Sequence, residues 1–205
     1  MKKITLHILI VLACFSITLN GQDATVLSKA FDSSYIFERN GFYEKAAGAL
    51  KQHYIAESYE MNLRLGWLSY LAGNQAQSME YYNKAIVLAP YAIEPRLGYV
   101  LPLSKIGNWN DVLEQYKKIL EVDPMNTFVN YKVGMIYYYR EQYDLALPYF
   151  EKVANLYPFD YDSNIMFAWT SYRLGKLREA KVLFQKVLLM RPNDDSALQG
   201  LGMIK

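Results

Sequence analysis

Four prolines recur along the chain at a constant interval of 34 residues: Pro90, Pro124, Pro158 and Pro192. The whole chain of 205 residues holds only seven prolines, so chance does not readily produce this spacing. A fixed period of this length is typical of a protein built from stacked copies of one small unit. Because proline cannot continue a helix, each of the four predicts the end of a helical unit.

Further columns of residues keep the same period. One is aromatic: Tyr82, Tyr116, Phe150 and Phe184. Two are small except in the unit around residue 100: Ser78, Val112, Ala146 and Ala180, and Gly66, Val100, Gly134, Ala168 and Gly202. A fourth holds glycine with one exception: Gly73, Gly107, Glu141 and Gly175.

Each column has a physical reason in a pair of antiparallel helices. Small residues such as Gly134 and Ala146 allow two helices to approach closely, and Phe150 fills the gap towards the next unit. The periodic glycine ends the first helix in a left-handed conformation without steric cost. Two residues after each of the last three prolines, a polar side chain is placed to cap the next helix: Asn126, Asp160 and Asp194.

This pattern resembles the tetratricopeptide repeat family. The unit containing Val133-Gly134, Tyr137, Tyr143, Ala146, Phe150 and Pro158 matches that family's signature at nearly every column. The resemblance implies an all-α fold, a right-handed α-solenoid of antiparallel helix pairs. It places the solenoid at residues 23–205, with about five repeats and a terminal helix: 27–58, 59–92, 93–126, 127–160, 161–194 and 195–205.

Two prolines depart from the pattern. Pro102 falls inside the first helix of its repeat, where it removes a hydrogen bond and is expected to kink the helix. Val100 replaces the small residue of this same repeat, and Gly98 is expected to take over the close contact. Pro148 strains the second helix of the following repeat in a similar way. Local repacking explains both departures more simply than a functional pocket does.

The first 22 residues have the layout of a secretory signal peptide. Lys2 and Lys3 precede an apolar run at residues 4–19, and removal is expected near Gly21 or Gln22. An uncleaved anchor is an alternative, although the run is shorter than a membrane-spanning helix needs. The only cysteine, Cys14, lies in a stretch that loosely resembles a bacterial lipobox, so lipidation at this cysteine is a third interpretation.

Charge and residue types exclude several classes of function. Residues 1–22 hold two lysines and no acid, so the remaining chain has 20 Lys+Arg against 20 Asp+Glu. A neutral chain without a basic run gives little affinity for nucleic acid. Beyond the signal, His53 is the only histidine and no cysteine remains, which disfavours nucleophilic catalysis by Cys-His and His-rich or Cys-rich metal sites. No catalytic residue, metal site or cofactor is predicted, and the chain is not expected to be an enzyme.

The resemblance also implies a binding surface, because the first helix of each pair lines the concave face of such solenoids. The corresponding residues of this chain are mainly aromatic and apolar: Tyr35, Leu63, Trp67, Tyr70, Leu97, Leu101, Tyr131, Met135, Tyr138, Ile165, Trp169 and Tyr172. Apolar residues at positions such as Leu63 and Leu97 do not reproduce the family's basic clamp for a C-terminal carboxylate. The predicted partner is a protein or peptide that presents a hydrophobic segment or an amphipathic helix.

The sequence therefore predicts an exported adaptor that mediates protein-protein contacts, located in the periplasm or cell envelope if the source is Gram-negative. Contact with a membrane is expected only through a lipid anchor or an uncleaved signal. Three alternatives stay open. The chain is a lipid-anchored structural subunit of an envelope assembly or secretion complex, or an enzyme without a recognisable catalytic constellation, or a solenoid whose aromatic rings fill its own groove.

Overall fold

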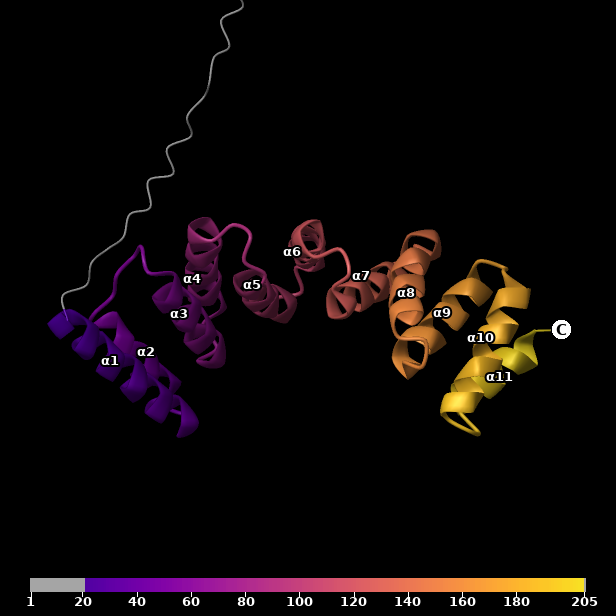
Figure 1. The fold of residues 1–205 in the computed structure, drawn as a ribbon, viewed down its shortest axis with the longest axis horizontal. Helices are drawn as coiled ribbons and strands as arrows, with labels where there is room; N and C mark the ends of the chain where they lie inside the picture. The colour runs from indigo at the N-terminus through magenta and orange to yellow at the C-terminus, as the bar shows by residue number, and fades with distance from the viewer. Residues whose placement is uncertain (1–20, 205) are drawn as a thin grey trace, which may run out of the picture. The chain divides into compact units, whose positions relative to one another are not determined.

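A computed structural model describes residues 21–204, which form helices α1 to α11 and no strand (Figure 1). The chain divides into two compact units, one ending at His53 and the other beginning at Tyr54. The all-α fold class is confirmed. Most of the predicted signal, with Cys14, lies outside the described residues. Among the residues described, no helix is both long and apolar enough to cross a membrane.

The first unit is a single helix pair, α1 (Gly21–Arg39) and α2 (Tyr43–Lys51). The chain reverses at Gly41, whose positive φ of 76° is a conformation that suits a residue without a side chain. The two helices pack through small and aliphatic side chains, and Ala30, Ala46 and Leu50 are all buried.

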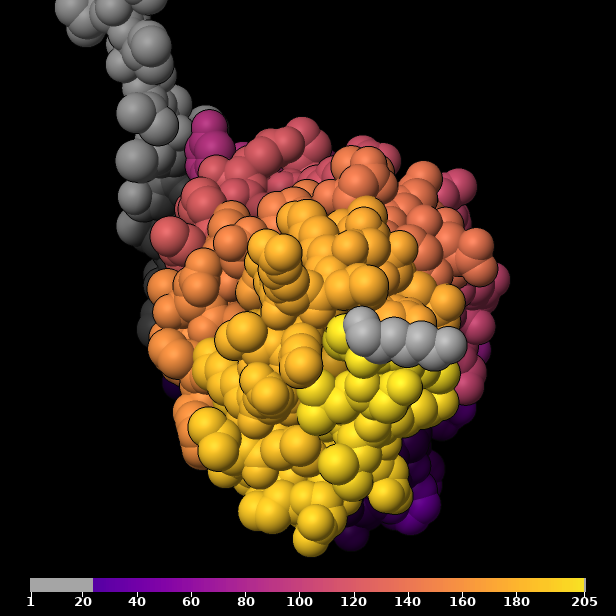
Figure 2. Space-filling model, turned by 90° about the vertical axis from the view of Figure 1, so that its right-hand side faces the viewer, coloured from indigo at the N-terminus to yellow at the C-terminus, as the bar shows by residue number. Residues whose placement is uncertain are grey.

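The second unit is a row of helices in which each contacts the next. It comprises α3 (Tyr59–Leu71), α4 (Gln75–Leu88), α5 (Glu94–Lys105), α6 (Trp109–Val122), α7 (Thr127–Tyr139), α8 (Tyr143–Leu156), α9 (Tyr161–Arg173), α10 (Leu177–Met190) and α11 (Asp195–Met203). Successive helices from α3 to α10 form pairs joined by tight turns, which is the architecture of a helical solenoid. Figure 2 views this unit from its C-terminal end, where α10 and α11 form the surface.

The turns inside these pairs use the predicted glycine column. Gly73, Gly107 and Gly175 have φ values of 80°, 76° and 73°, so each adopts the left-handed conformation. Glu141 occupies the same slot between α7 and α8 with a φ of 57°. Its side chain adds steric strain that glycine avoids, so this turn forms at an energetic cost the others do not have.

Close approach between helices depends on other glycines. A Cβ atom on Gly134 would lie 2.8 Å from Cε1 of Phe150, so this glycine allows α7 to pack closely on α8. A Cβ atom on Gly98 would lie 2.2 Å from Cε1 of Tyr82, so α5 does use Gly98 for its close contact. At the C-terminal end the prediction for Gly202 is wrong. That residue has open space around it, and Gly200 is the one that packs on Phe184.

Helices α3, α7, α9 and α11 begin at polar caps. Asn126, Asp160 and Asp194 accept hydrogen bonds from the backbone N–H three residues later, at 3.0, 2.8 and 2.9 Å, as predicted. Ser58 caps α3 in the same way, at 3.2 Å. Each of these side chains satisfies a backbone donor that the helix itself leaves unpaired.

A second set of polar residues ties each first helix to the loop before it. Asn62, Asn130 and Asn164 are fully buried, and the side-chain amide of each donates to backbone carbonyls four and six residues earlier. In the pair formed by α5 and α6, Arg96 of α5 donates through Nη2 to the carbonyl of Pro90 at 3.1 Å. At every boundary between helix pairs of the second unit, a side chain of the first helix therefore donates a hydrogen bond to a carbonyl of the preceding loop.

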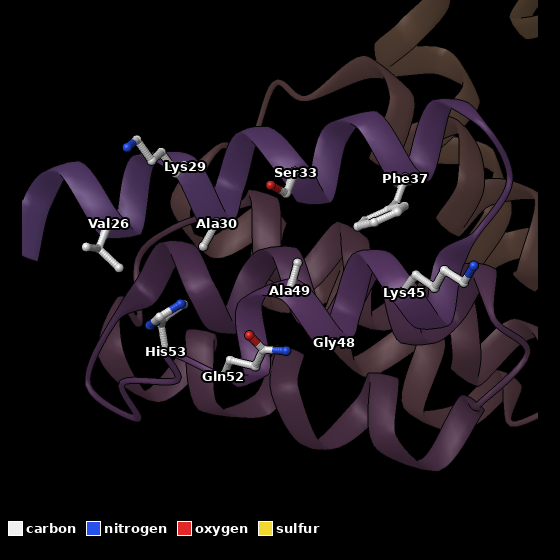
Figure 3. A pocket seen from close by; sticks show the side chains of 10 residues that line it. All are labelled: Val26, Lys29, Ala30, Ser33, Phe37, Lys45, Gly48, Ala49, Gln52 and His53. Atoms are coloured by element: carbon white, nitrogen blue, oxygen red, sulfur yellow. The ribbon is translucent and has the colours of Figure 1, made fainter.

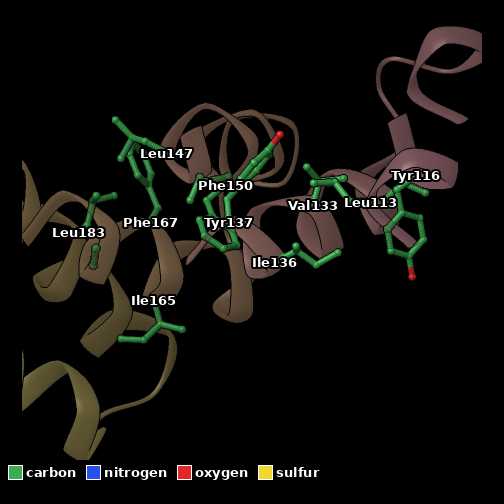
Figure 4. Packing of buried hydrophobic residues seen from close by; sticks show 14 of the residues in the cluster. Leu113, Tyr116, Val133, Ile136, Tyr137, Leu147, Phe150, Ile165, Phe167 and Leu183 are labelled. Carbon is green, nitrogen blue, oxygen red and sulfur yellow. The ribbon is translucent and has the colours of Figure 1, made fainter. Parts of the chain in front are cut away.

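The hydrophobic core of the second unit runs along the row without interruption from α5 to α11. Figure 4 shows a part of this core in which Tyr116, Ile136, Phe150 and Phe167 belong to the successive helices α6, α7, α8 and α9. Helices α5 and α8 continue through Pro102 and Pro148. Of these two prolines, Pro102 is buried and Pro148 is exposed.

Candidate functional site

The candidate site is a groove of about 840 Å³ between α7 and the turn that joins α5 to α6. Ser104 comes from the end of α5, and two aromatic residues come from α6. The remaining residues form a stripe along α7 and its C-terminal end. The lining consists of Ser104, Trp109, Tyr116, Tyr131, Lys132, Met135, Ile136, Tyr139 and Arg140.

Helix periodicity explains why α7 can serve both the core and the groove. Val133 and Tyr137 are buried in the core, as Figure 4 shows. The residues Tyr131, Met135 and Tyr139, spaced four apart, line the groove on another side of the helix. Because α7 is apolar on both sides, its groove side presents an apolar surface to solvent.

The rings of the groove differ in exposure. Trp109 and Tyr139 are 49% and 76% exposed, whereas Tyr116 is only 6% exposed and forms part of the floor. Burial raises the pKa of the Tyr116 phenol. Burial is also the main cause of the raised pKa of Tyr131, and the negative charge of Asp162 adds to it. Large exposed rings above a buried aromatic floor are a common arrangement at protein interfaces.

The charged side chains of the groove are both cations. Arg140 donates through Nη2 to Oδ1 of Asn110 at 2.9 Å, a neutral partner. The Nζ atom of Lys132 lies 5.4 Å from the centre of the Phe128 ring. The lining includes no carboxylate. Among the described residues there is also no cluster of three or more potential metal ligands.

The structure brings two of the predicted groove residues, Tyr131 and Met135, into this site. Ten of the twelve predicted residues are half-buried: Leu63, Trp67, Tyr70, Leu97, Leu101, Tyr131, Met135, Tyr138, Trp169 and Tyr172. Ile165 is buried, with 7% exposure, and offers little surface to a partner. Tyr35 is 45% exposed and belongs to the first unit.

Several predicted groove rings make contacts within the solenoid. Trp169 donates through Nε1 to Oγ of Ser196 at 2.8 Å, and its ring centre lies 4.9 Å from that of Phe184. Tyr138 packs edge-on against Tyr143, with ring centres 5.2 Å apart. Trp67 and Tyr70 pack against each other at 5.9 Å. Trp169 in particular links α9 to α11, which is a packing role.

Sequence reasoning missed most of the groove: Ser104, Trp109, Tyr116, Lys132, Ile136, Tyr139 and Arg140. The sequence places Tyr116 in the periodic aromatic column and gives no sign that it lines a groove. The missing signal was the stripe at Tyr131, Met135 and Tyr139, which continues a predicted pair by one further turn of the same helix. Trp109 could not be found in this way because it lies on a different helix.

A second, smaller pocket of about 550 Å³ lies between α1 and α2 of the first unit (Figure 3). Val26, Ala30 and Phe37 come from α1, while Ala49 comes from α2 and His53 follows that helix. The predicted residue Tyr35 does not line this pocket. Its lining also holds Lys29, Ser33, Lys45, Gly48 and Gln52, but it has no counterpart of the exposed rings of Trp109 and Tyr139, so the groove beside α7 is the stronger candidate.

Comparison with known proteins identifies the family to which the repeats of this chain belong. Two models described as tetratricopeptide repeat match residues 32–93 and 137–202. The chain contains tetratricopeptide repeats. A curated relative, Tetratricopeptide repeat protein 1 of Schizosaccharomyces pombe, is 31% identical over 87 residues, which are 42% of this chain. The match spans only 8% of that relative's length.

Solved structures of tetratricopeptide repeat proteins have the same fold. One from Parabacteroides merdae ATCC 43184 superposes with a TM-score of 0.72 and 18% identity, covering 88% of this chain and 72% of that one. Another is YrrB, described as a TPR protein with an unusual peptide-binding site. It gives a TM-score of 0.65 and 22% identity, covering 79% of this chain and 81% of YrrB. At these identities the likeness shows the fold alone.

Proposed function

We propose that this tetratricopeptide repeat protein is an adaptor that binds a protein or peptide partner in the groove beside α7. The observation that carries the proposal is the pair of exposed rings, Trp109 and Tyr139, above an apolar floor. Tetratricopeptide repeats are a scaffold for protein interaction, and the similarly folded YrrB is described as having a peptide-binding site. Half-buried predicted residues on first helices of the second unit, such as Leu97, Leu101 and Tyr138, extend the proposed surface beyond the groove.

The proposed ligand is a hydrophobic segment or an amphipathic helix. The groove volume lies within the range of pockets that enclose small ligands, so it holds individual side chains of a partner. Rings such as Trp109 and Tyr139 contribute large contact areas at low cost in side-chain entropy. We propose a non-catalytic role for this groove, in which aromatic and aliphatic side chains provide contact area and Lys132 and Arg140 provide positive charge.

A capture experiment with matched tyrosine variants tests the binding site. The tagged chain, its Trp109→Ala/Tyr139→Ala variant and a Tyr91→Ala control are each incubated with native envelope extract. Tyr91 is 81% exposed and does not line the groove, so it matches Tyr139 in exposure and chemistry. We expect the double variant to lose a partner that the wild type and the control both retain. Equal recovery by all three would place the interface elsewhere.

We further propose that the chain is exported. The support is the pattern of Lys2 and Lys3 followed by the apolar run at residues 4–19. Cell fractionation followed by N-terminal sequencing of the mature chain tests this. We expect an extracytoplasmic product that begins near Gly21 or Gln22. A chain recovered intact from the cytoplasm would contradict the proposal.

A further inference from the structure

The two cations of the groove stand at a defined interval along α7. Lys132 lies in the second turn of the helix, and Arg140 directly follows its last residue. At 1.5 Å per residue, their offset of eight positions corresponds to about 12 Å along the axis, or slightly more than two turns. Both side chains are exposed, and the apolar residues Met135, Ile136 and Tyr139 lie between them in the same groove.

The charge of this pair is not neutralised inside the groove. The partner of Arg140 is the uncharged amide of Asn110, and Lys132 lies over the ring of Phe128. The carboxylates that influence Tyr131 belong to the start of α9, namely Asp160 and Asp162. Asp160 accepts a hydrogen bond from the backbone of Ser163, and neither acid lines the groove. The groove is therefore apolar at its centre and positive at both ends.

We propose that the partner is an acidic amphipathic helix. A large apolar side chain of this helix enters the groove beside Trp109 and Tyr139, and two carboxylates seven or eight residues apart meet Lys132 and Arg140. The proposal rests on the proposed function and adds the charge pattern of the partner to it. Opposite charges placed in this way fix the register of a partner and select against basic helices.

The spacing favours a helix over other acidic ligands. Residues seven or eight apart lie on one face of an α-helix, with an apolar residue at the intervening third or fourth position facing the same way. An acidic chain terminus would provide a single carboxylate. Single-stranded nucleic acid also combines rings with cations, but the balance of 20 basic and 20 acidic residues outside the predicted signal gives it little electrostatic attraction.

Three synthetic helical peptides with one shared apolar face test the charge pattern. They differ only at two positions seven residues apart, which carry Glu/Glu, Gln/Gln or Lys/Lys. Binding to the purified full chain is measured by fluorescence anisotropy at low and high salt. Since exposed ion pairs contribute modestly, we expect the Glu/Glu peptide to bind roughly three- to tenfold tighter than Gln/Gln, with the difference shrinking at high salt.

A charge-reversed chain provides the decisive comparison. In the Lys132→Glu/Arg140→Glu variant we expect the order to invert, so that the Lys/Lys peptide binds best. An Arg178→Glu/Lys181→Glu variant changes the net charge equally on the exposed surface of α10 and should keep the wild-type order. Circular dichroism confirms that both variants are folded. Inversion in the first variant alone would support the proposal.

The other outcomes separate the two proposals. Equal binding of all three peptides, lost in Trp109→Ala/Tyr139→Ala, would overturn the charge pattern and leave the groove as a binding site. No binding by any peptide would overturn both the charge pattern and the amphipathic-helix ligand. Competition of an oligothymidine with the peptides at physiological salt would overturn the proposal in favour of nucleic acid.

Discussion

Replacing Gly98 by alanine tests whether a single missing side chain sets the spacing between two helix pairs. An added Cβ atom would lie 2.2 Å from Cε1 and 2.4 Å from Cζ of Tyr82. The ring is also confined from α3, because a Cβ atom on Gly66 would lie 2.9 Å from its Cγ and Cδ1 atoms. Tyr82 is only 2% exposed. Accommodating the methyl group therefore requires α5 to move away from α4.

The expected magnitude follows from two opposing effects. Alanine favours a helix over glycine by about 0.5–1 kcal/mol. Overpacking a dense core costs about 1–3 kcal/mol, and the confinement of Tyr82 argues for the upper part of that range. The net loss in the free energy of unfolding is about 1–2 kcal/mol. For a chain of this size, that lowers Tm by roughly 2–8 °C.

Urea and thermal unfolding, followed by far-UV circular dichroism, measure this loss. The control is Gly202→Ala in α11, where nothing lies within 4 Å of the added atom, so stability is expected to stay equal or rise. Combining Gly98→Ala with Tyr82→Leu should recover part of the loss, which a double-mutant cycle quantifies. A Gly98→Ala chain as stable as the Gly202→Ala chain would refute the reasoning.

Three further changes have defined outcomes. Glu141→Gly should raise the free energy of unfolding, measured by urea titration, by about 1 kcal/mol, because Glu141 has a positive φ of 57° that suits glycine. The control Gln142→Gly should give no gain, because Gln142 has a φ of −87°. Ser78→Ala should lower the free energy of unfolding by about 1 kcal/mol, because Ser78 Oγ donates to the buried carbonyl of Gly66 at 2.8 Å. An unchanged urea midpoint would contradict this expectation. Burial raises the pKa of Tyr82 above 10.0, so the unfolded chain ionises first and stability is lost as pH rises beyond 10. Stability measured from pH 8 upward should fall less steeply in Tyr82→Phe than in the wild type.

Much of the fold could be predicted because every repeat carries the same local sequence features. Caps such as Asp160, turn glycines such as Gly107 and close contacts such as Gly134 with Phe150 follow from backbone geometry that each unit repeats. The prediction failed at Gly202 because Gly66 and Gly134 of its column pack on an aromatic residue in the next helix, and no described helix follows α11. Packing there uses Gly200, which lies three periods of 34 residues after Gly98 and, like Gly98, packs on the preceding aromatic residue.

The candidate site was only partly predictable, because a groove depends on which helices leave space between them. The 34-residue period and the family resemblance predicted Tyr131 and Met135 as groove residues, and both line the groove. The same reasoning selected Trp169, whose indole N–H is used by Ser196 in packing. It gave no reason to select Trp109, since the contribution of α6 appears only once α6 and α7 are placed side by side.

The buried amides of Asn62, Asn130 and Asn164 also determine where the chain can accept foreign sequence. Each amide binds two carbonyls of the loop before its helix, so an insertion there would break both bonds and leave a buried donor unpaired. The turn at Gly175 is exposed, has open space around it and lies outside the groove. An epitope tag or a second domain grafted into the second unit therefore belongs inside a helix pair, at this turn, and not between two pairs.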